Sequence, residues 1–88
     1  MTLRSLVGDP PTPRQLDVLR SIYTLSAAVG YPPTLREVTR ALGLRAVNGI
    51  WEHAQRLRHK GLLCASHGSR TLRLTVLGER RARDRRAV

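Results

Sequence analysis

The 88-residue sequence has one cysteine, few aromatic rings and no long hydrophobic run. Cys64 stands alone, which excludes an intramolecular disulfide and any zinc site that needs two thiolates. A lone cysteine fits a reducing compartment, so we expect a cytoplasmic protein. No stretch approaches the roughly 18 apolar residues of a membrane span. Residues 1–8 are too short, and too soon broken by Asp9-Pro10-Pro11, to form a signal peptide.

Acidic residues are also scarce: 6 stand against 16 basic residues, which gives a formal net charge of +10. The excess does not depend on the C-terminal residues, because residues 1–77 keep a net charge of +7 without them. All the basic residues except Lys60 are arginine. This composition predicts attraction to phosphate backbones, although high-GC coding would also favour arginine. With only Tyr23, Tyr31 and Trp51, few rings are available to stack single-stranded bases.

The first two helices are predicted from capping signals and apolar periodicity. Residues 1–11 are expected to be an N-terminal arm, more simply a frayed terminus than a packing element. A Thr-x-x-Gln capping box at Thr12 begins the first helix, which Gly30 ends. A Thr-x-x-Glu box at Thr34 begins a short second helix, which Gly43 ends.

The third helix is predicted to begin between Ala46 and Asn48 and to end at Gly61. Its buried stripe is expected to consist of Ile50, Ala54 and Leu57. A short apolar run over residues 62–65, a turn, and a segment that alternates with period two over residues 71–75 then predict a β-hairpin over residues 62–75. The basic tail, residues 76–88, has too few apolar residues for a core of its own, and Thr75 can cap a last helix over Glu79–Arg86.

This order of elements is typical of a winged helix-turn-helix, a mainly α fold with a small β-hairpin, here over residues 12–75. Within this range lie two characteristic motifs: Gly-Tyr-Pro-Pro-Thr-Leu-Arg-Glu-Val, which begins at Gly30, and Ala-Leu-Gly-Leu, which begins at Ala41. The same range contains His53, Leu57 and the motif Lys-Gly-Leu-Leu, which begins at Lys60. Together they resemble the DNA-binding domain of LexA-type repressors. The resemblance implies a three-helix winged domain that reads the major groove of double-stranded DNA with its third helix.

The resemblance and the helical pattern nominate two groups of DNA-contacting residues. Base contacts are expected from the outer side of the third helix, at Asn48, Gly49, Trp51, Glu52 and Gln55. Asparagine and glutamine can pair with an adenine edge, and glutamate can accept a hydrogen bond from cytosine. Backbone contacts are expected along the second helix, the turn and the hairpin, at Thr34, Arg36, Arg40, Arg45, Ala46, Arg70 and Arg73.

Several of these residues have a simpler structural explanation. Asn48 can cap the third helix as well as read a base. Gly49 costs the helix about 1 kcal/mol relative to alanine, which close approach of a DNA backbone or chance would explain. Trp51 is expected to be partly exposed, contacting a thymine methyl group or a protein partner, or folding back over the first helix. Gln55 and His59 can be solvated surface. His53 is interpreted as a hydrogen-bonded structural histidine and Cys64 as a small buried hydrophobe.

The sequence departs from the LexA pattern in three ways. Ala46 stands where relatives usually have a serine or threonine, and Trp51 where many have a polar residue. The family also carries a second domain, which cleaves itself with a Ser–Lys pair and also drives dimerisation. Because 88 residues leave no room for it, we expect a stand-alone reader without autoproteolysis. A homodimer on a palindromic site is expected, since two half-sites multiply discrimination.

The leading hypothesis is therefore a small bacterial or phage transcriptional regulator of the repressor type, without a cofactor. The alternative is a winged-helix module that binds a protein, with Trp51 as its anchor, and modulates another regulator. An enzyme is not indicated, because no nucleophile–base pair, glycine-rich phosphate loop or carboxylate pair is present. A metal site is not indicated either, since His53, His59, Cys64 and His67 lack a compact ligand spacing.

Overall fold

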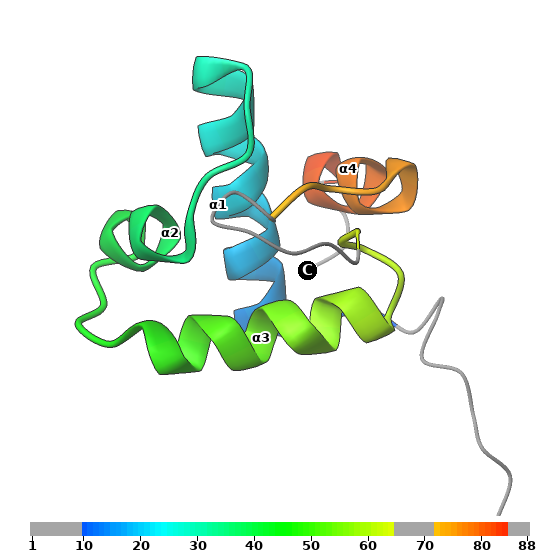
Figure 1. The fold of residues 1–88 in the computed structure, drawn as a ribbon. Helices are drawn as coiled ribbons and strands as arrows, with labels where there is room; N and C mark the ends of the chain where they lie inside the picture. The colour runs from blue at the N-terminus through cyan, green and yellow to red at the C-terminus, as the bar shows by residue number, and fades with distance from the viewer. Residues whose placement is uncertain (1–9, 65–71, 85–88) are drawn as a thin grey trace, which may run out of the picture.

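The computed structural model describes residues 10–64 and 72–84 of the chain. In these two stretches the chain forms four helices: α1 (Pro13–Val29), α2 (Leu35–Ala41), α3 (Val47–His59) and α4 (Val76–Arg83). The first helix is central and packs against the other three, and α2 also packs against α3. Figure 1 shows α3 running across the N-terminal end of α1, with α2 and α4 on opposite sides of α1. The pair α2 and α3 is the expected helix-turn-helix.

Both predicted capping boxes are confirmed. The Thr12 hydroxyl accepts a hydrogen bond from the Gln15 N–H at 3.2 Å, and the Gln15 side chain accepts one from the Thr12 N–H. The same reciprocal pair joins Thr34 and Glu37, at 3.1 and 2.9 Å. These bonds satisfy backbone donors that a helix start otherwise leaves unpaired. At the other end of α1, Gly30 takes a φ of 85°, a left-handed conformation that favours glycine.

The core is aliphatic. Its buried residues come from all four helices and from the segments that join α3 to α4. The predicted stripe of α3 is confirmed, because Ile50, Ala54 and Leu57 are fully buried. Tyr23 only packs against this core from outside. The fully or nearly buried hydrophobic residues are Leu16, Val18, Leu19, Ile22, Val38, Ile50, Ala54, Leu57, Leu62, Leu63, Leu72 and Ala82.

The predicted β-hairpin is not seen. Among the described residues, Leu63 and Leu74 form one isolated antiparallel bridge instead of two paired strands. The Cys64 N–H donates to the Arg73 carbonyl at 2.9 Å beside it. At the other end of the bridge, the Thr75 hydroxyl donates to the Gly61 carbonyl at 2.7 Å, where α4 begins. The turn predicted between the two segments lies outside the described residues.

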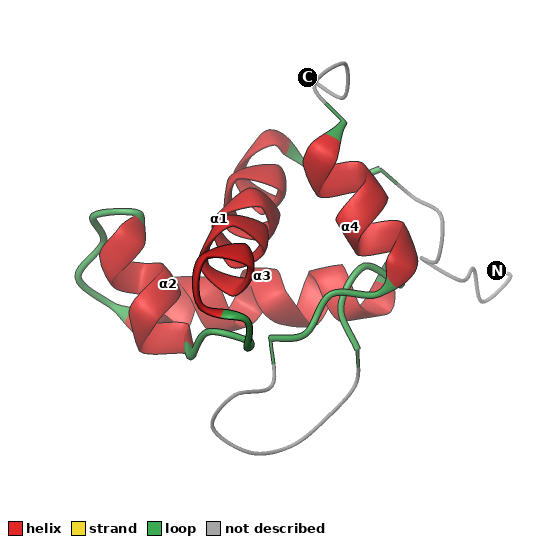
Figure 2. Cartoon of the chain, turned by 90° about the horizontal axis from the view of Figure 1, so that it is seen from above, coloured by secondary structure: helices red, strands yellow, loops and turns green. Residues whose placement is uncertain are grey.

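The last helix begins three residues earlier than predicted. Thr75 is its N-cap, as expected, and its hydroxyl accepts from the Gly78 N–H at 3.0 Å. However, α4 covers Val76–Arg83 instead of Glu79–Arg86, and it packs against α1. Gly78 and Ala82 are the buried residues of this helix. The views along and across α1 agree that α1 and α4 lie side by side (Figures 1 and 2).

The end of α3 is joined to the start of α1 by Lys60. Its ammonium group donates to the Gln15 side-chain oxygen at 2.6 Å and to the Pro10 carbonyl at 3.0 Å. Gln15 is only 4% exposed, so this charge-assisted bond is partly shielded from water. The single lysine therefore links the C-terminal end of α3 to the segment that begins α1. Over residues 10–64 and 72–84, no helix has the length and apolar character needed to cross a membrane.

Candidate nucleic-acid interface

A groove runs along the turn between α2 and α3. The turn is compact because Gly43 takes a φ of 72° and its N–H donates to the Arg40 carbonyl at 3.0 Å. The next N–H, of Leu44, donates to the Thr39 carbonyl at 3.0 Å. These bonds hold the turn against the end of α2. The groove is lined by Arg36, Thr39, Arg40, Gly43, Leu44, Arg45, Ala46, Val47 and Asn48.

The groove is positively charged. Arg36, Arg40 and Arg45 are exposed, and no acidic residue is among those that line it. The N-cap of α3 is Ala46, whose side chain makes no capping hydrogen bond. The first N–H groups of α3 therefore lack the side-chain acceptor that Thr12 and Thr34 give the earlier helices. Guanidinium groups beside a helix N-terminus suit an anion such as a phosphate group.

The outer side of α3 continues from this groove. Four of its predicted base-contact residues are exposed together: Asn48, Gly49, Trp51 and Glu52. The alternative that Asn48 caps α3 is wrong, because Ala46 occupies the N-cap position and Asn48 lies inside the helix. Trp51 is 51% exposed, as expected, so it is not buried against the first helix. The helix thus presents amide, carboxylate and indole groups to solvent on the side opposite its aliphatic stripe.

Gln55 differs from these four residues. It is half-buried, and its side-chain oxygen accepts a hydrogen bond from Arg58 one turn later. Arg58 in turn donates from its Nε to the Cys64 carbonyl at 3.2 Å. A glutamine that reads adenine uses both its oxygen and its NH₂ group. Gln55 would have to share or give up its bond to Arg58, so we expect it to contribute less than Asn48.

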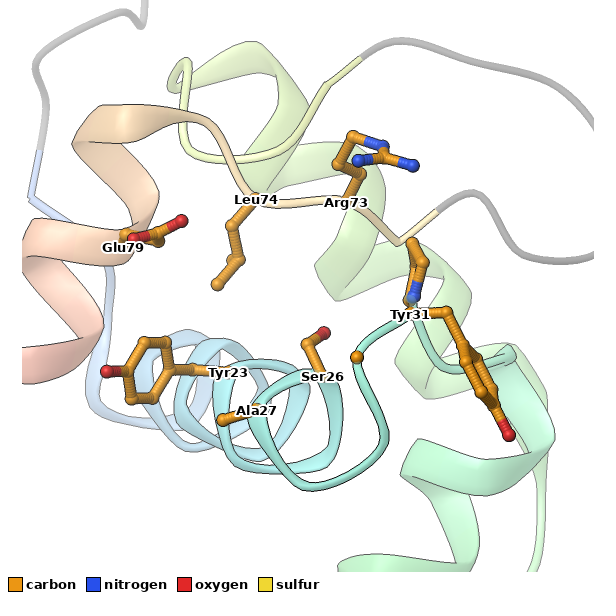
Figure 3. Close-up of a pocket in the computed structure, with 9 residues that line it drawn as sticks. Tyr23, Ser26, Ala27, Tyr31, Arg73, Leu74 and Glu79 are labelled. Carbon is orange, nitrogen blue, oxygen red and sulfur yellow. The ribbon is translucent and has the colours of Figure 1, made fainter.

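Of the remaining predicted backbone contacts, Thr34 and Arg73 do not line the groove. Thr34 is half-buried, and its hydroxyl accepts the capping bond from Glu37. Arg73 is exposed but lies at a second depression, between α1, α4 and residues 73–74 (Figure 3). In that view the Leu74 side chain points toward α1, whereas the Arg73 side chain points away from it. Arg70 lies outside the described residues.

Two further residues were assigned structural roles. His53 is half-buried, and among the described residues its buried Nδ1 has no hydrogen-bond partner, so the expected hydrogen bond is not seen at this atom. Cys64 is half-buried, and its Sγ lies 3.9 Å from the Leu74 carbonyl. Within residues 10–64 and 72–84 no three metal-ligating side chains come together. His67, the fourth residue of the disfavoured metal set, lies outside this part of the chain.

Val47 is an exposed residue of this surface that sequence reasoning missed. It lines the groove and is 38% exposed, although it is a large hydrophobic residue. The available signal was its spacing, because residues four apart lie on the same face of a helix and Val47 precedes Trp51 by four.

Gly49 is expected to be a site where alanine stabilises the fold. A Cβ atom at this position would meet no atom within 4 Å, and the residue lies inside α3. Alanine gains about 1 kcal/mol over glycine in a helix interior, so Gly49→Ala should raise the melting temperature by roughly 4 to 8 °C. Thermal unfolding followed by circular dichroism measures this. Gly43→Ala is the contrasting variant, because its φ of 72° makes the same change unfavourable. A lowered melting temperature for Gly49→Ala would contradict the open space seen around this residue.

Comparison with known proteins agrees with this architecture. The family model of the LexA DNA binding domain matches residues 9–71, which is more than half of the chain. The LexA repressor of Anaeromyxobacter sp. (strain Fw109-5) is 47% identical over 55 residues, covering 62% of this chain and 24% of that protein. The LexA repressor of Pseudoalteromonas atlantica is 43% identical over 67 residues, covering 75% and 32%.

A third LexA repressor, from Geobacter sp. (strain M21), is 38% identical over 71 residues, covering 81% of this chain and 35% of the relative. The chain thus spans about a quarter to a third of the length of these curated relatives. No solved structure matches. The match over residues 9–71 includes α1, α2, the basic groove and α3, so this chain belongs to the LexA DNA-binding domain family.

Proposed function

We propose that this protein is a sequence-specific reader of double-stranded DNA that acts as a small transcriptional repressor. The observation that carries the proposal is the groove between α2 and α3, where Arg36, Arg40 and Arg45 surround the start of a helix with an exposed polar side. The relatives named above are repressors, which supports the same conclusion. In this proposal α3 enters the major groove, and the arginines contact the phosphate backbone on its rim.

The experiment that tests the proposal is selection of binding sites from a random pool of duplex DNA at near-physiological salt. Purely electrostatic binding is suppressed under these conditions, so an enriched motif reports base reading. An enriched palindrome would support the homodimer that the sequence predicts, and a single half-site would support a monomer. A pool that remains random would contradict sequence-specific binding. A bacterial or phage source, a cytoplasmic location and the absence of autoproteolysis stay predictions.

Two substitutions on α3 are expected to change which sequence is preferred. Asn48→Ala removes a bidentate partner for adenine, and Glu52→Ala removes an acceptor for the cytosine amino group. Each should reduce discrimination against the wrong base at one position by about tenfold, since a good contact contributes about 1 to 3 kcal/mol. Competition binding with single-base variants of the selected site measures this. His59→Ala, an exposed change in the last turn of α3, is the control. Unchanged preferences in both α3 variants would contradict base reading by this face.

A protein-interaction module is the second candidate, and the exposure of Trp51 and Val47 favours it. Large apolar side chains at a helix surface are typical anchors of protein interfaces. This candidate predicts that Trp51→Ala abolishes binding of a protein partner while the affinity for DNA stays the same. The DNA-reading proposal predicts the opposite, a change in DNA binding by the purified variant alone.

A further inference from the structure

The exposed side of α3 carries an apolar strip as well as polar groups. Among the described residues, five large hydrophobic side chains are exposed, and two of them lie on this helix: Val47 at 38% and Trp51 at 51%. Because they are four residues apart, their side chains are neighbours on the same face. The fully buried Ile50 lies between them in the sequence and faces the core. The strip is therefore a surface feature and not an edge of the core.

The surroundings of the strip indicate what covers it. Val47 itself lines the groove formed with Arg36, Arg40 and Arg45, so the strip begins inside a positively charged depression. Exposed Asn48 lies next to it in the same groove. An apolar partner such as a membrane or a protein core would have to desolvate these guanidinium groups without pairing them, which is costly. Duplex DNA offers phosphate groups that can pair with the arginines, and base edges in the major groove that the helix can contact.

The major groove of DNA presents one kind of apolar group, the methyl group at C5 of a pyrimidine. Thymine carries this methyl group, and 5-methylcytosine carries the same one. We propose that Val47 and Trp51 together contact the C5-methyl group of a pyrimidine, so that the preferred half-site is fixed in part by a methyl group instead of a hydrogen bond. This inference rests on the proposed DNA reading and names the chemical group that the strip recognises. It also adds Val47 to the specificity-determining residues.

The test uses the full chain and the duplex obtained by selection. Each thymine of the half-site is replaced in turn by deoxyuridine, which removes the methyl group and keeps every hydrogen-bonding atom. We expect one or two positions to lose about fourfold in affinity, as burial of a single methyl group predicts, and the others to be unchanged. Each cytosine is likewise replaced by 5-methylcytosine, where a comparable gain in affinity would identify that base as the source of the methyl group.

Variants link the effect to the strip. Trp51→Ala and Val47→Ala should bind the thymine and deoxyuridine duplexes equally at the sensitive position, whereas Asn48→Ala should keep the fourfold difference. Both residues of the strip are exposed, and a melting temperature close to that of the parent protein checks that each variant is folded. If either strip variant unfolds, the other one supplies the comparison.

The outcomes separate this inference from the proposed function. A selected site whose affinity is insensitive to every methyl removal and addition would overturn methyl recognition while leaving sequence-specific binding in place. A methyl effect that persists in both strip variants would assign the contact to other residues and would also overturn the inference. The absence of any selected site would overturn the proposed function, and this inference with it.

Discussion

Replacing Gly78 with alanine is expected to destabilise the fold by about 2 kcal/mol or more, the largest effect of any single change considered. The helix α4 begins so close to the end of α3 that a Cβ atom on Gly78 would overlap the Leu62 carbonyl oxygen and stand 3.0 Å from its carbonyl carbon. Both atoms belong to the backbone, so no side chain can rotate away. The backbone also cannot yield freely, because the Thr75 N–H donates to that same Leu62 carbonyl at 3.2 Å.

Thermal or denaturant unfolding of the Gly78→Ala variant measures this loss. A change of 2 kcal/mol corresponds to a fall in melting temperature of roughly 8 to 16 °C for a domain of this size. Gly49→Ala is the matched control, since it makes the same change in helix propensity at a position with open space around it. The two variants should move the melting temperature in opposite directions. A Gly78→Ala protein as stable as its parent would show that α4 does not approach Leu62 as described.

Removing two arginines from α2 is expected to weaken binding to all duplex sequences by roughly 30-fold at 0.15 M salt. Arg36 and Arg40 lie one turn apart on the exposed side of α2 and line the same groove. Each arginine is expected to neutralise one phosphate, and each such contact releases about 0.9 counterion. Changing both residues to glutamine should therefore reduce the slope of log K against log salt concentration by about 1.8 in magnitude. The loss should be uniform across sequences, since phosphates carry no base identity.

A matched pair on α4 controls for net charge. Arg80→Gln with Arg83→Gln removes the same two charges from exposed positions on the other side of α1. We expect this pair to change affinity less than threefold, because it acts only through the long-range field, which salt screens. Binding isotherms at several salt concentrations measure both slopes. Equal effects of the two pairs would contradict a phosphate-contacting role for the α2 groove.

The parts of the fold that local sequence encodes were predictable. Thr12, Thr34 and Thr75 all cap helices, because a capping box or N-cap depends on residues within one turn. The start of α4 was placed three residues too late, although its N-cap Thr75 was correctly identified. Gly78 lies in the first turn of α4, where a Cβ atom would overlap the Leu62 carbonyl oxygen. The two residues are 16 positions apart in sequence, so no local pattern reveals this contact.

The same limit applies to the hairpin and to the site. Alternation in residues 71–75 predicts strand geometry, but it does not reveal that the Thr75 hydroxyl bonds the Gly61 carbonyl where α4 begins. The groove arginines lie on one helix and its turn, so helical spacing was enough to predict that they share a surface. The position of Arg73 beside α4, and the engagement of Gln55 by Arg58, depend on contacts that no local pattern contains.

Trp51 also has a spectroscopic consequence. It is the sole tryptophan of the chain, and the buried core formed by the described residues contains no aromatic ring. Because the indole is half-exposed in the folded state, its emission should change little in wavelength when the protein unfolds. A duplex lying on α3 would instead shield the indole from water and quench its fluorescence. Intrinsic fluorescence should therefore follow occupancy of α3 without a label, nearly independently of folding.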